Sequence, residues 1–363
     1  MRIIFRADAA TWIGTGHIMR CMTLAKALQG QGAQCEFVCK EFSGSLIKEL
    51  REKEFVVHTL PVLRTFTEAS KKAEQKLPHS HWLDTNEVED AEQCLDILSS
   101  EPTSWVVVDH YALAAKWEQI CSKLTKRLMV IDDLADRPHH CDVLLDQTYG
   151  RQKASYAVHI RKPCQMLLGT KYALLRPEFV DLRKESLDRR SSSKVKNILI
   201  SMGGIDQANA TALVLSALLH AELPTYCEIK VVMGASAPWI EEVKQIANAL
   251  PWEVEVIVNT SDMGRLMVQC DLAIGAAGAT AWERCCLGVP TLLAVLAENQ
   301  RTIASALVDS GAARLVELDV TKIAAQVNQL ITDHLSLGEL SAASAKLVDG
   351  KGAERAAYEL GKI

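Results

Sequence analysis

The sequence has few aromatic residues, no excess of positive charge and no long apolar run. Aromatic residues make up 5% of the 363 residues, and 40 Lys and Arg stand against 45 Asp and Glu. The resulting formal charge of −5 offers no bulk attraction for nucleic acid or anionic lipid. Charged residues interrupt the first apolar stretch, and no later run is long enough to cross a bilayer. We therefore expect a soluble, cytoplasmic, monomeric protein with no nucleic-acid or membrane partner.

Paired cysteine spacings are also missing. The 11 Cys residues are an odd number, and none of them forms a C-x-x-C pair. This pattern argues against a disulfide framework or a zinc knuckle and predicts buried, reduced thiols. Acidic strand ends at Asp109 and at Asp132 and Asp133 could bind a metal, but no His or Glu at ligand spacing accompanies them. We therefore expect no metal and no cofactor.

Short β-rich runs alternate with helical patterns along the whole chain. This alternation is typical of parallel sheets covered by helices, and at about 150 residues per domain the length suggests two domains. A polar stretch near residue 190 separates two series of strands, so we predict Rossmann-like domains at 1–188 and 189–363. The predicted strands are 3–7, 35–39, 55–60, 105–109, 128–132, 143–146 and 166–169 in the first half, and 197–201, 228–232, 254–258, 272–274 and 291–295 in the second.

The predicted sheets place functional residues on the loops where strands end. Ligands of open α/β sheets bind outside the carboxyl ends of the strands. We therefore expect the two domains to face each other across a cleft, with strand-exit loops from both domains contributing to one site. The charged, aperiodic segment 61–82 is interpreted as a lid.

The loop after the first predicted strand carries a histidine. Gly14 and Gly16 allow a sharp turn, and His17 falls in the first turn of the following helix. A helix N-terminus disfavours the protonated imidazole, so His17 can act as a base near neutral pH. It could equally cap its helix, and Arg20 could simply cover a helix face. Met19 stands where a dinucleotide fingerprint needs its third glycine, which argues against NAD.

Two loops of the second half could hold a phosphate. Gly203 and Gly204 close a strand, where backbone amides can cradle an anion or simply form a turn. A later small-residue loop contains Gly278 and leads to Thr280, which opens a helix whose positive end suits a diphosphate. Glu283 could complete a capping box or accept hydrogen bonds from two ribose hydroxyls.

A further strand-exit loop carries Glu298, Asn299 and Gln300. These side chains would reach the same cleft, although they are equally good helix-capping residues.

With these loops in place, the sequence resembles the family of hydrolases that act on UDP-2,4-diacetamido-2,4,6-trideoxy-β-L-altropyranose in pseudaminic acid biosynthesis. The resemblance extends from residue 1 to about residue 310. Its motifs are R-A-D at 6–8, I-G-T-G-H at 13–17, M-R at 19–20, D-x-Y at 109–111, D-D at 132–133, S-M-G-G at 201–204, G-x-x-G-x-T-x-x-E at 275–283 and E-N-Q at 298–300. The stretch 14–20 is the most specific, whereas the loop 275–283 recurs across the wider GT-B glycosyltransferase group.

The resemblance implies a GT-B-like fold and hydrolysis of the UDP-sugar at its anomeric C–O bond, with inversion and without a metal. His17 would be the general base that activates water. Tyr111 and Asn299 would hold the sugar or the water, and Asp8 and Arg20 would orient His17 or the substrate. The substrate-binding residues would be Gly14, Gly16, Gly203, Gly204, Gly278, Thr280, Gln300 and Glu283, with Glu283 on the ribose.

Three other functions stay open from the sequence. A glycosyltransferase of the same fold would pass the sugar to an acceptor hydroxyl, but the mixed-sign stretch 51–55 is unlike an apolar, basic membrane patch, which favours water as acceptor. In a non-enzymatic sugar-nucleotide sensor, His17 would be structural. A hydrolysing epimerase would need carboxylates arranged for chemistry at C2 of UDP-N-acetylglucosamine. The chain is longer than compact family members in segment 61–82 and at its tail, so no role is carried over to those segments.

Overall fold

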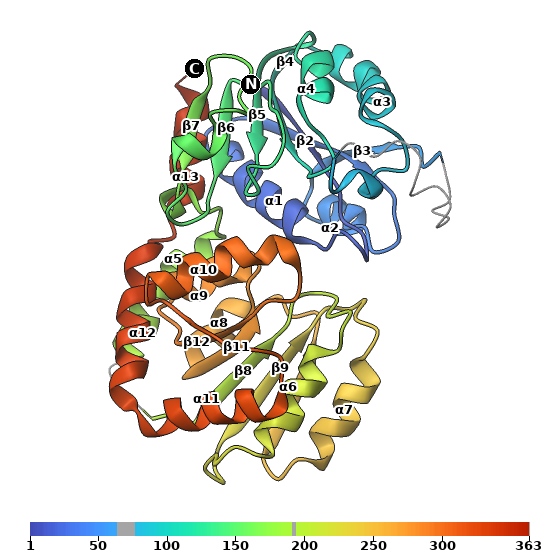
Figure 1. The fold of residues 1–363 in the computed structure, drawn as a ribbon. Coiled ribbons are helices and arrows are strands. Elements are labelled where there is room, and N and C mark those ends of the chain that lie inside the picture. Colours follow the sequence, from blue (N-terminus) through green and yellow to red (C-terminus); the bar gives the residue numbers. More distant parts are fainter. Residues whose placement is uncertain (64–76, 191–193, 363) are drawn as a thin grey trace. The chain divides into compact units, whose positions relative to one another are not determined.

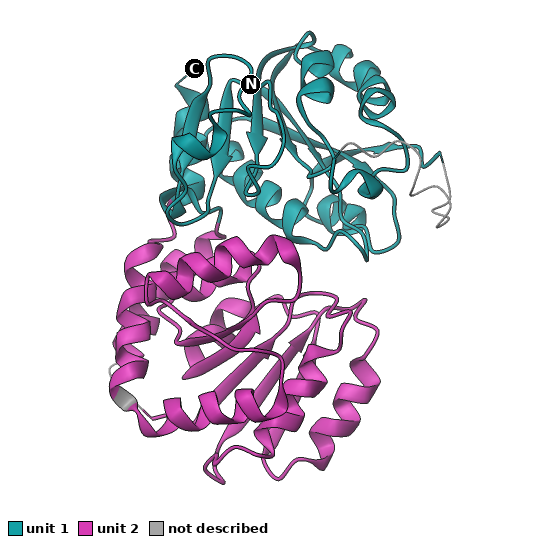
Figure 2. Cartoon of the chain, in the orientation of Figure 1, with its two compact units in different colours: residues 1–174, 352–363 teal, residues 175–351 magenta. Residues whose placement is uncertain are grey.

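The computed structural model describes residues 1–63, 77–190 and 194–362. The chain forms two compact units (Figure 2), Met1–Leu174 together with Gly352–Ile363, and Leu175–Lys351. Each unit is built around one parallel sheet whose strands alternate with helices (Figure 1). The predicted α/β class with two Rossmann-like sheets is therefore confirmed. Within the described ranges, no helix combines the length and the apolar character needed to cross a membrane.

The first unit contains a seven-stranded sheet in the order β3-β2-β1-β4-β5-β6-β7. The strand order reverses between β1 and β4, and at such a switch point the loops diverge and leave room for a ligand. Asp109, the last residue of β4, pairs with Ala7 at the carboxyl end of β1. The strands are β1 (Arg2–Ala7), β2 (Gln34–Lys40), β3 (Val56–Leu60), β4 (Thr103–Asp109), β5 (Thr125–Ile131), β6 (Val143–Asp146) and β7 (Gln165–Leu168).

Alternating residues of this sheet face two hydrophobic cores, because successive side chains of a strand point to opposite faces. Ile3 and Phe5 pack in the core that contains helices α1 (Gly16–Gln29), α2 (Ile47–Glu52) and α13 (Gly352–Gly361). Ile4 and Val106 pack in the core that contains α3 (Glu87–Ser99) and α4 (Ala115–Cys121). Burial on both faces explains why these strands read as nearly continuous apolar runs.

The second unit repeats this plan with a six-stranded sheet in the order β10-β9-β8-β11-β12-β13, and its switch point lies between β8 and β11. The strands are β8 (Asn197–Ser201), β9 (Glu228–Met233), β10 (Glu253–Val258), β11 (Leu272–Ala276), β12 (Thr291–Ala294) and β13 (Arg314–Leu315). The helices are α5 (Pro177–Arg189), α6 (Ala210–Leu218), α7 (Ile240–Ala249), α8 (Met263–Gln269), α9 (Thr280–Cys286), α10 (Arg301–Asp309), α11 (Val320–Thr332) and α12 (His334–Leu347).

The division of the chain differs from the predicted boundary at 188/189 in two places. Helix α5 belongs to the second unit, where Phe179 and Leu182 are buried. The polar composition that suggested a linker is that of an amphipathic helix with one apolar stripe. The last helix, α13, belongs to the first unit, where Leu360 is completely buried. The predicted cleft between the two halves stays a prediction.

The segment 61–82, predicted to be a lid, is described only in part. Residues 64–76 lie outside the described residues. The end of the segment forms a short 3-10 helix, Ser80–Trp82, and Trp82 packs in the core with α3 and α4.

Candidate active site

His17 lies in the first turn of α1, directly after the loop that follows β1, and its side chain is buried. Its Nδ1 lies 2.6 Å from Oδ1 of Asp109, at the end of β4. Burial raises the pKa of Asp109, but the charges of Arg20 and His17 outweigh it and hold this pKa well below its ordinary value. Because Asp109 is ionised, it accepts a hydrogen bond from Nδ1–H, which leaves Nε2 as the ring nitrogen that can accept a proton. No described residue hydrogen-bonds Nε2, so the atom is available as a base.

Arg20 connects two carboxylates around His17. It donates from Nη2 to Oδ1 of Asp109 (2.6 Å) and from Nη1 to Oδ2 of Asp133 (2.7 Å). Asp133, just beyond β5, accepts a hydrogen bond from the hydroxyl of Tyr111. Arg20 therefore fixes both Asp109 and Asp133, the partner of Tyr111. The orienting role that the resemblance implies for it stays a prediction.

Aromatic rings surround the imidazole of His17. The ring of Tyr111 meets it edge-on, with centroids 4.6 Å apart, and Trp82 lies 5.7 Å away. Trp82 also stacks on Tyr111 at 5.2 Å. His79 packs against both rings and its Nδ1 is buried without a hydrogen-bond partner in the described part of the chain. The rings hold His17 in one orientation.

The contacts of Asp8 in the described part of the chain do not include His17, so the structure does not support Asp8 as the residue that orients His17, and its other expected role, to orient the substrate, stays a prediction. Its carboxylate is fully buried, accepts a hydrogen bond from the backbone N–H of Lys40 (2.8 Å) and lies 2.7 Å from Nη1 of Arg6. Its other neighbour is His110, at 3.4 Å. Asp8 thus belongs to a separate buried charge cluster, and Asp109 takes its place beside His17.

The turn before α1 leaves open space next to the N-terminus of this helix. Gly14 has φ +84°, a left-handed conformation that suits glycine, and its N–H bonds the carbonyl of Ala10. A Cβ placed on Gly14 or on Gly16 would meet no described atom within 4 Å. Thr15 precedes the helix and does not cap it with its side chain. The turn therefore leaves the N–H groups of the first helical turn free of a side-chain partner.

In the second unit, the loop after β8 packs closely against Gly234, a glycine that the sequence analysis did not single out. Gly203 has φ +90°. A Cβ on Gly234, just after β9, would lie 2.1 Å from the carbonyl oxygen of Gly204. Asp206 caps α6 by accepting from the N–H groups of Ala210 (2.8 Å) and Thr211 (2.9 Å). An anion at this place could therefore accept hydrogen bonds from the backbone N–H groups of the loop, but not from those at the start of α6.

The loop after β11 leads to Thr280 and Glu283 on α9. A Cβ on Gly278 would meet nothing within 4 Å, so the loop is open at this residue. The capping box considered for Glu283 does not form, because Thr280 is already helical and Ala279, the capping residue, makes no side-chain bond. Burial raises the pKa of Glu283 to about 7, although Arg176, 3.9 Å away, lowers it. Because the carboxyl group of Glu283 makes no capping hydrogen bond, it can accept hydrogen bonds from ribose hydroxyls.

The polar residues after β12 differ in their hydrogen bonds. Oδ1 of Asn299 is buried without a hydrogen-bond partner in the described part of the chain. Oε1 of Gln300 accepts from the N–H of Leu296 (2.9 Å), so this side chain stabilises its own loop. Asn299 therefore keeps an unused acceptor, whereas Gln300 has only its amide N–H groups to offer.

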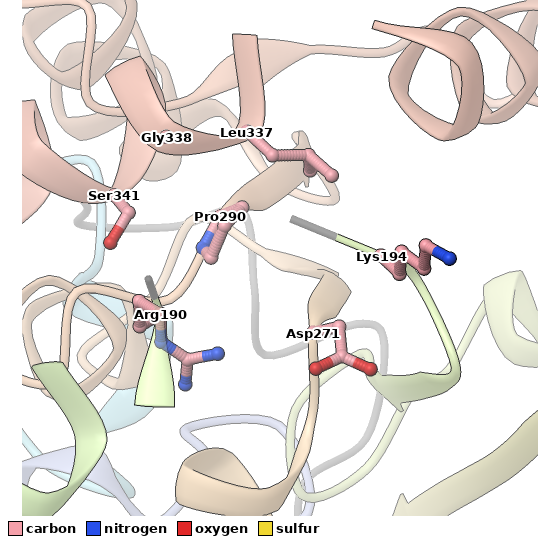
Figure 3. Close-up of a pocket in the computed structure, with 7 residues that line it drawn as sticks. All are labelled: Arg190, Lys194, Asp271, Pro290, Leu337, Gly338 and Ser341. Atoms are coloured by element: carbon pink, nitrogen blue, oxygen red, sulfur yellow. The ribbon is translucent and has the colours of Figure 1, made fainter. Parts of the chain in front are cut away.

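A small hollow of the second unit lies at the opposite end of the sheet from these loops (Figure 3). It is lined by Asp271, which precedes β11, Pro290, which precedes β12, and residues of α12 such as Ser341. The hollow is therefore separate from the candidate phosphate loops. In the described ranges, no group of three or more His, Cys, Asp or Glu is arranged to hold a metal ion.

Four residues of these sites were missed as site residues. Asp109 and Asp133 were noted as acidic strand ends and as parts of the motifs at 109–111 and 132–133, but no role beside His17 was predicted for either. The signal that identifies them is the 3-2-1-4-5 strand order, which brings the ends of β1, β4 and β5 together. Gly234 contacts the loop after β8, and Arg284 contacts the loop after β11. Gly234 acts through a contact distant in sequence, whereas Arg284 directly follows the motif at 275–283, which assigns no role to it.

Comparisons with known proteins find relatives by sequence and by fold. Residues 198–357 match the model of the glycosyltransferase family 28 C-terminal domain. The chain is 24% identical over 311 residues to the UDP-2,4-diacetamido-2,4,6-trideoxy-β-L-altropyranose hydrolase of Campylobacter jejuni, which covers 86% of this chain and 97% of that protein.

Two solved structures share the fold over the whole chain. MurG of Acinetobacter baumannii has a TM-score of 0.70 at 17% identity and covers 100% of this chain and 99% of its own. A UDP-GlcNAc 2-epimerase of Neisseria meningitidis has a TM-score of 0.68 at 14% identity, and the match covers 100% of both chains. With its two 3-2-1-4 sheets and these structural neighbours, the chain has a GT-B-like fold.

Proposed function

We propose that the protein hydrolyses the anomeric C–O bond of UDP-2,4-diacetamido-2,4,6-trideoxy-β-L-altropyranose with inversion, releasing UDP and the free sugar. The comparisons support a sugar-nucleotide-processing enzyme. The observation that carries the proposal further is the pair of His17 and ionised Asp109 at the switch point of the first sheet, with Nε2 available.

In the proposed reaction, Nε2 of His17 takes a proton from water as the water oxygen attacks the anomeric carbon. The bond between this carbon and the diphosphate oxygen breaks, and UDP leaves with the electron pair. Asp109 stabilises the imidazolium that forms, and the proton then passes to solvent. Because attack occurs opposite the leaving group in one step, the configuration inverts.

The leaving group explains why one base suffices. The diphosphate spreads the charge that develops on its oxygen, and fixed N–H groups aimed at it lower the barrier further, so a dedicated general acid is not needed. Gly203, Gly204, Gly278 and Thr280 are proposed to supply these contacts, and Glu283 to accept from the ribose. Tyr111 and Asn299 are proposed to hold the sugar or the water in line.

The decisive experiment is turnover of this UDP-sugar in ¹⁸O-labelled water, with a chelator present. We expect the label in the free sugar and none in UDP. H17N should lower kcat about 10²- to 10⁴-fold, the usual range for a lost general base, while UDP binding persists. The control H220N changes an exposed histidine of the second unit and should leave kcat unchanged. Label in UDP, or full activity of H17N, would refute the mechanism.

A glycosyltransferase is the second candidate, favoured by the match of residues 198–357 to a glycosyltransferase domain. It would use the same nucleotide contacts but pass the sugar to a hydroxyl. A panel of UDP-sugars, each with and without acceptor alcohols and read by NMR of the products, separates the two. Turnover that requires an alcohol would replace the hydrolase proposal.

A further inference from the structure

In the described part of the chain, one buried arginine of the second unit forms no ion pair with a carboxylate. Arg284 on α9 is 2% exposed, and its Nε has no hydrogen-bond partner in the part of the chain that the structure describes. In contrast, the buried Arg6, Arg20 and Arg137 of the first unit each form an ion pair with an aspartate. Burial lowers the pKa of the Arg284 guanidinium, and the weaker opposing interactions, among them that with Glu283, do not outweigh it. A buried cation left in this state destabilises the ligand-free fold.

The guanidinium lies where β8 and β11 end, at the switch point of the second sheet. Nη2 donates to the carbonyl of Ala276 (2.7 Å), and Nη1 lies 3.4 Å from the hydroxyl of Thr280. A Cβ on Gly275 would lie 2.6 Å from Nη1 and 2.9 Å from the carbonyl oxygen of Ser201. Gly275 and Ser201 are paired residues of β11 and β8, so the missing side chain at 275 makes room for the guanidinium.

Both candidate phosphate loops therefore begin beside the same positive charge. The loop of Gly203 and Gly204 continues from Ser201, and the loop of Gly278 starts from Ala276, which Arg284 holds directly. The ligand side of these loops is open, since a Cβ on Gly203 or Gly278 would meet nothing within 4 Å.

We propose that Arg284 is the internal counter-charge of the bound diphosphate. It positions the loop 275–280 through its bond to Ala276 and stabilises the anion electrostatically across that loop. Arg284 is thus a positioning residue, which acts through the loop and not by direct contact. The inference rests on the proposed function, because it takes a nucleoside diphosphate as the ligand.

The test compares UDP, which carries the diphosphate, with uridine, which lacks it, as ligands in calorimetric titrations. R284Q and R284M should weaken UDP binding at least tenfold and change uridine binding less than twofold. R284K keeps the charge and should bind UDP within about threefold of the wild type. The melting temperature of ligand-free R284Q and R284M should stay the same or rise, because a buried unpaired charge is removed.

The matched control is R265Q, which removes one positive charge from the exposed arginine of α8 that pairs with Glu185. It should leave both affinities within twofold of the wild type. Equal weakening of UDP and uridine by R284Q would overturn the inference, because it would show a general role in folding the unit. The same holds if R284Q and R284M fail to fold while R284K folds. Wild-type protein that binds neither ligand would instead refute the proposed function.

Discussion

At the scale of single residues, the position of a proton decides whether His17 can act. Asp109 holds Nδ1–H because its own charge is stabilised by the bidentate guanidinium of Arg20. The imidazole therefore presents the nitrogen that accepts a proton. This assignment depends on three side chains from α1 and β4, and it can be tested one residue at a time.

We expect D109N to lower kcat about 10²- to 10⁴-fold with little change in KM, because a neutral amide no longer fixes the tautomer or stabilises the imidazolium. Steady-state kinetics on the proposed UDP-sugar measure both constants. D96N, on an exposed position of α3, serves as the control and should match the wild type. Wild-type kcat in folded D109N would show that Asp109 does not assist His17.

Glu283 should make nucleoside binding depend on pH. Its pKa of about 7 lies above its ordinary 4.5, so in the ligand-free protein it gains charge as the pH rises from 6 to 8. The carboxylate accepts from two ribose hydroxyls better than the acid does, so uridine should bind more tightly at pH 8 than at pH 6, by up to about tenfold per unit below the pKa. Titration with uridine, which has no phosphate to ionise, measures this, and E283Q should show a flat profile.

The same group should affect stability in the opposite direction. A carboxyl group whose pKa is raised by burial stabilises the fold fully below about pH 4.5, and this contribution is lost as the pH rises through about 7. Ligand-free wild type should therefore lose more thermal stability between pH 5 and pH 8 than E283Q. Identical slopes for the two proteins would remove Glu283 as the titrating group.

At the scale of helices and strands, the strands could be predicted from the sequence, but the residues that support the functional loops could not. All twelve predicted strands overlap strands of the structure, because buried parallel strands produce apolar runs that are easy to recognise. The two-residue β13 is too short to give such a signal. The loops with His17, Gly203 and Gly278 were found from their glycines, whereas their supports, Asp109 and Gly234, depend on strand order, which local patterns do not contain.

Gly234 offers a test of loop support at this scale. A Cβ at this position would collide with the carbonyl of Gly204, which is backbone and cannot rotate away. We expect G234A to displace the loop and to weaken UDP binding at least tenfold, with a lower melting temperature. G338A, on α12 with no atom within 4 Å of the added Cβ, is the matched control and should bind UDP normally. Normal binding by G234A would show that the position of this loop is unimportant for the nucleotide.

At the scale of the whole molecule, the second unit is inserted between two parts of the first. The polar stretch near residue 190 misled the domain assignment, because an exposed helix face and a linker have the same composition. The assignment of α13 requires knowledge of its packing partner α1, and helical periodicity alone does not reveal a partner. Whole-molecule connectivity was thus the part of the fold least accessible from sequence.

Because the C-terminal helix α13 packs in the first unit, a mutation in this helix should lower the stability of that unit. Leu360 is completely buried in the core with α1 and β1. L360A should cost about 2 to 5 kcal/mol of unfolding free energy, the range for a buried leucine, and UDP affinity should be unchanged. Denaturant unfolding and UDP titration measure the two effects. Y358S, at an exposed position of the same helix, should change stability by less than about 0.5 kcal/mol. Loss of UDP affinity in folded L360A would contradict the assignment of α13 to the first unit.

This connectivity also sets an order of assembly on the ribosome. The chain leaves the first unit at Leu174 and rejoins it at Gly352, so every residue of the second unit is synthesised before α13. Until then, the apolar side of α1 that α13 will cover stays exposed on the nascent chain. The first unit, most of which is synthesised before the second, is therefore the one that finishes folding last, and chaperones that recognise apolar surface have their longest opportunity there.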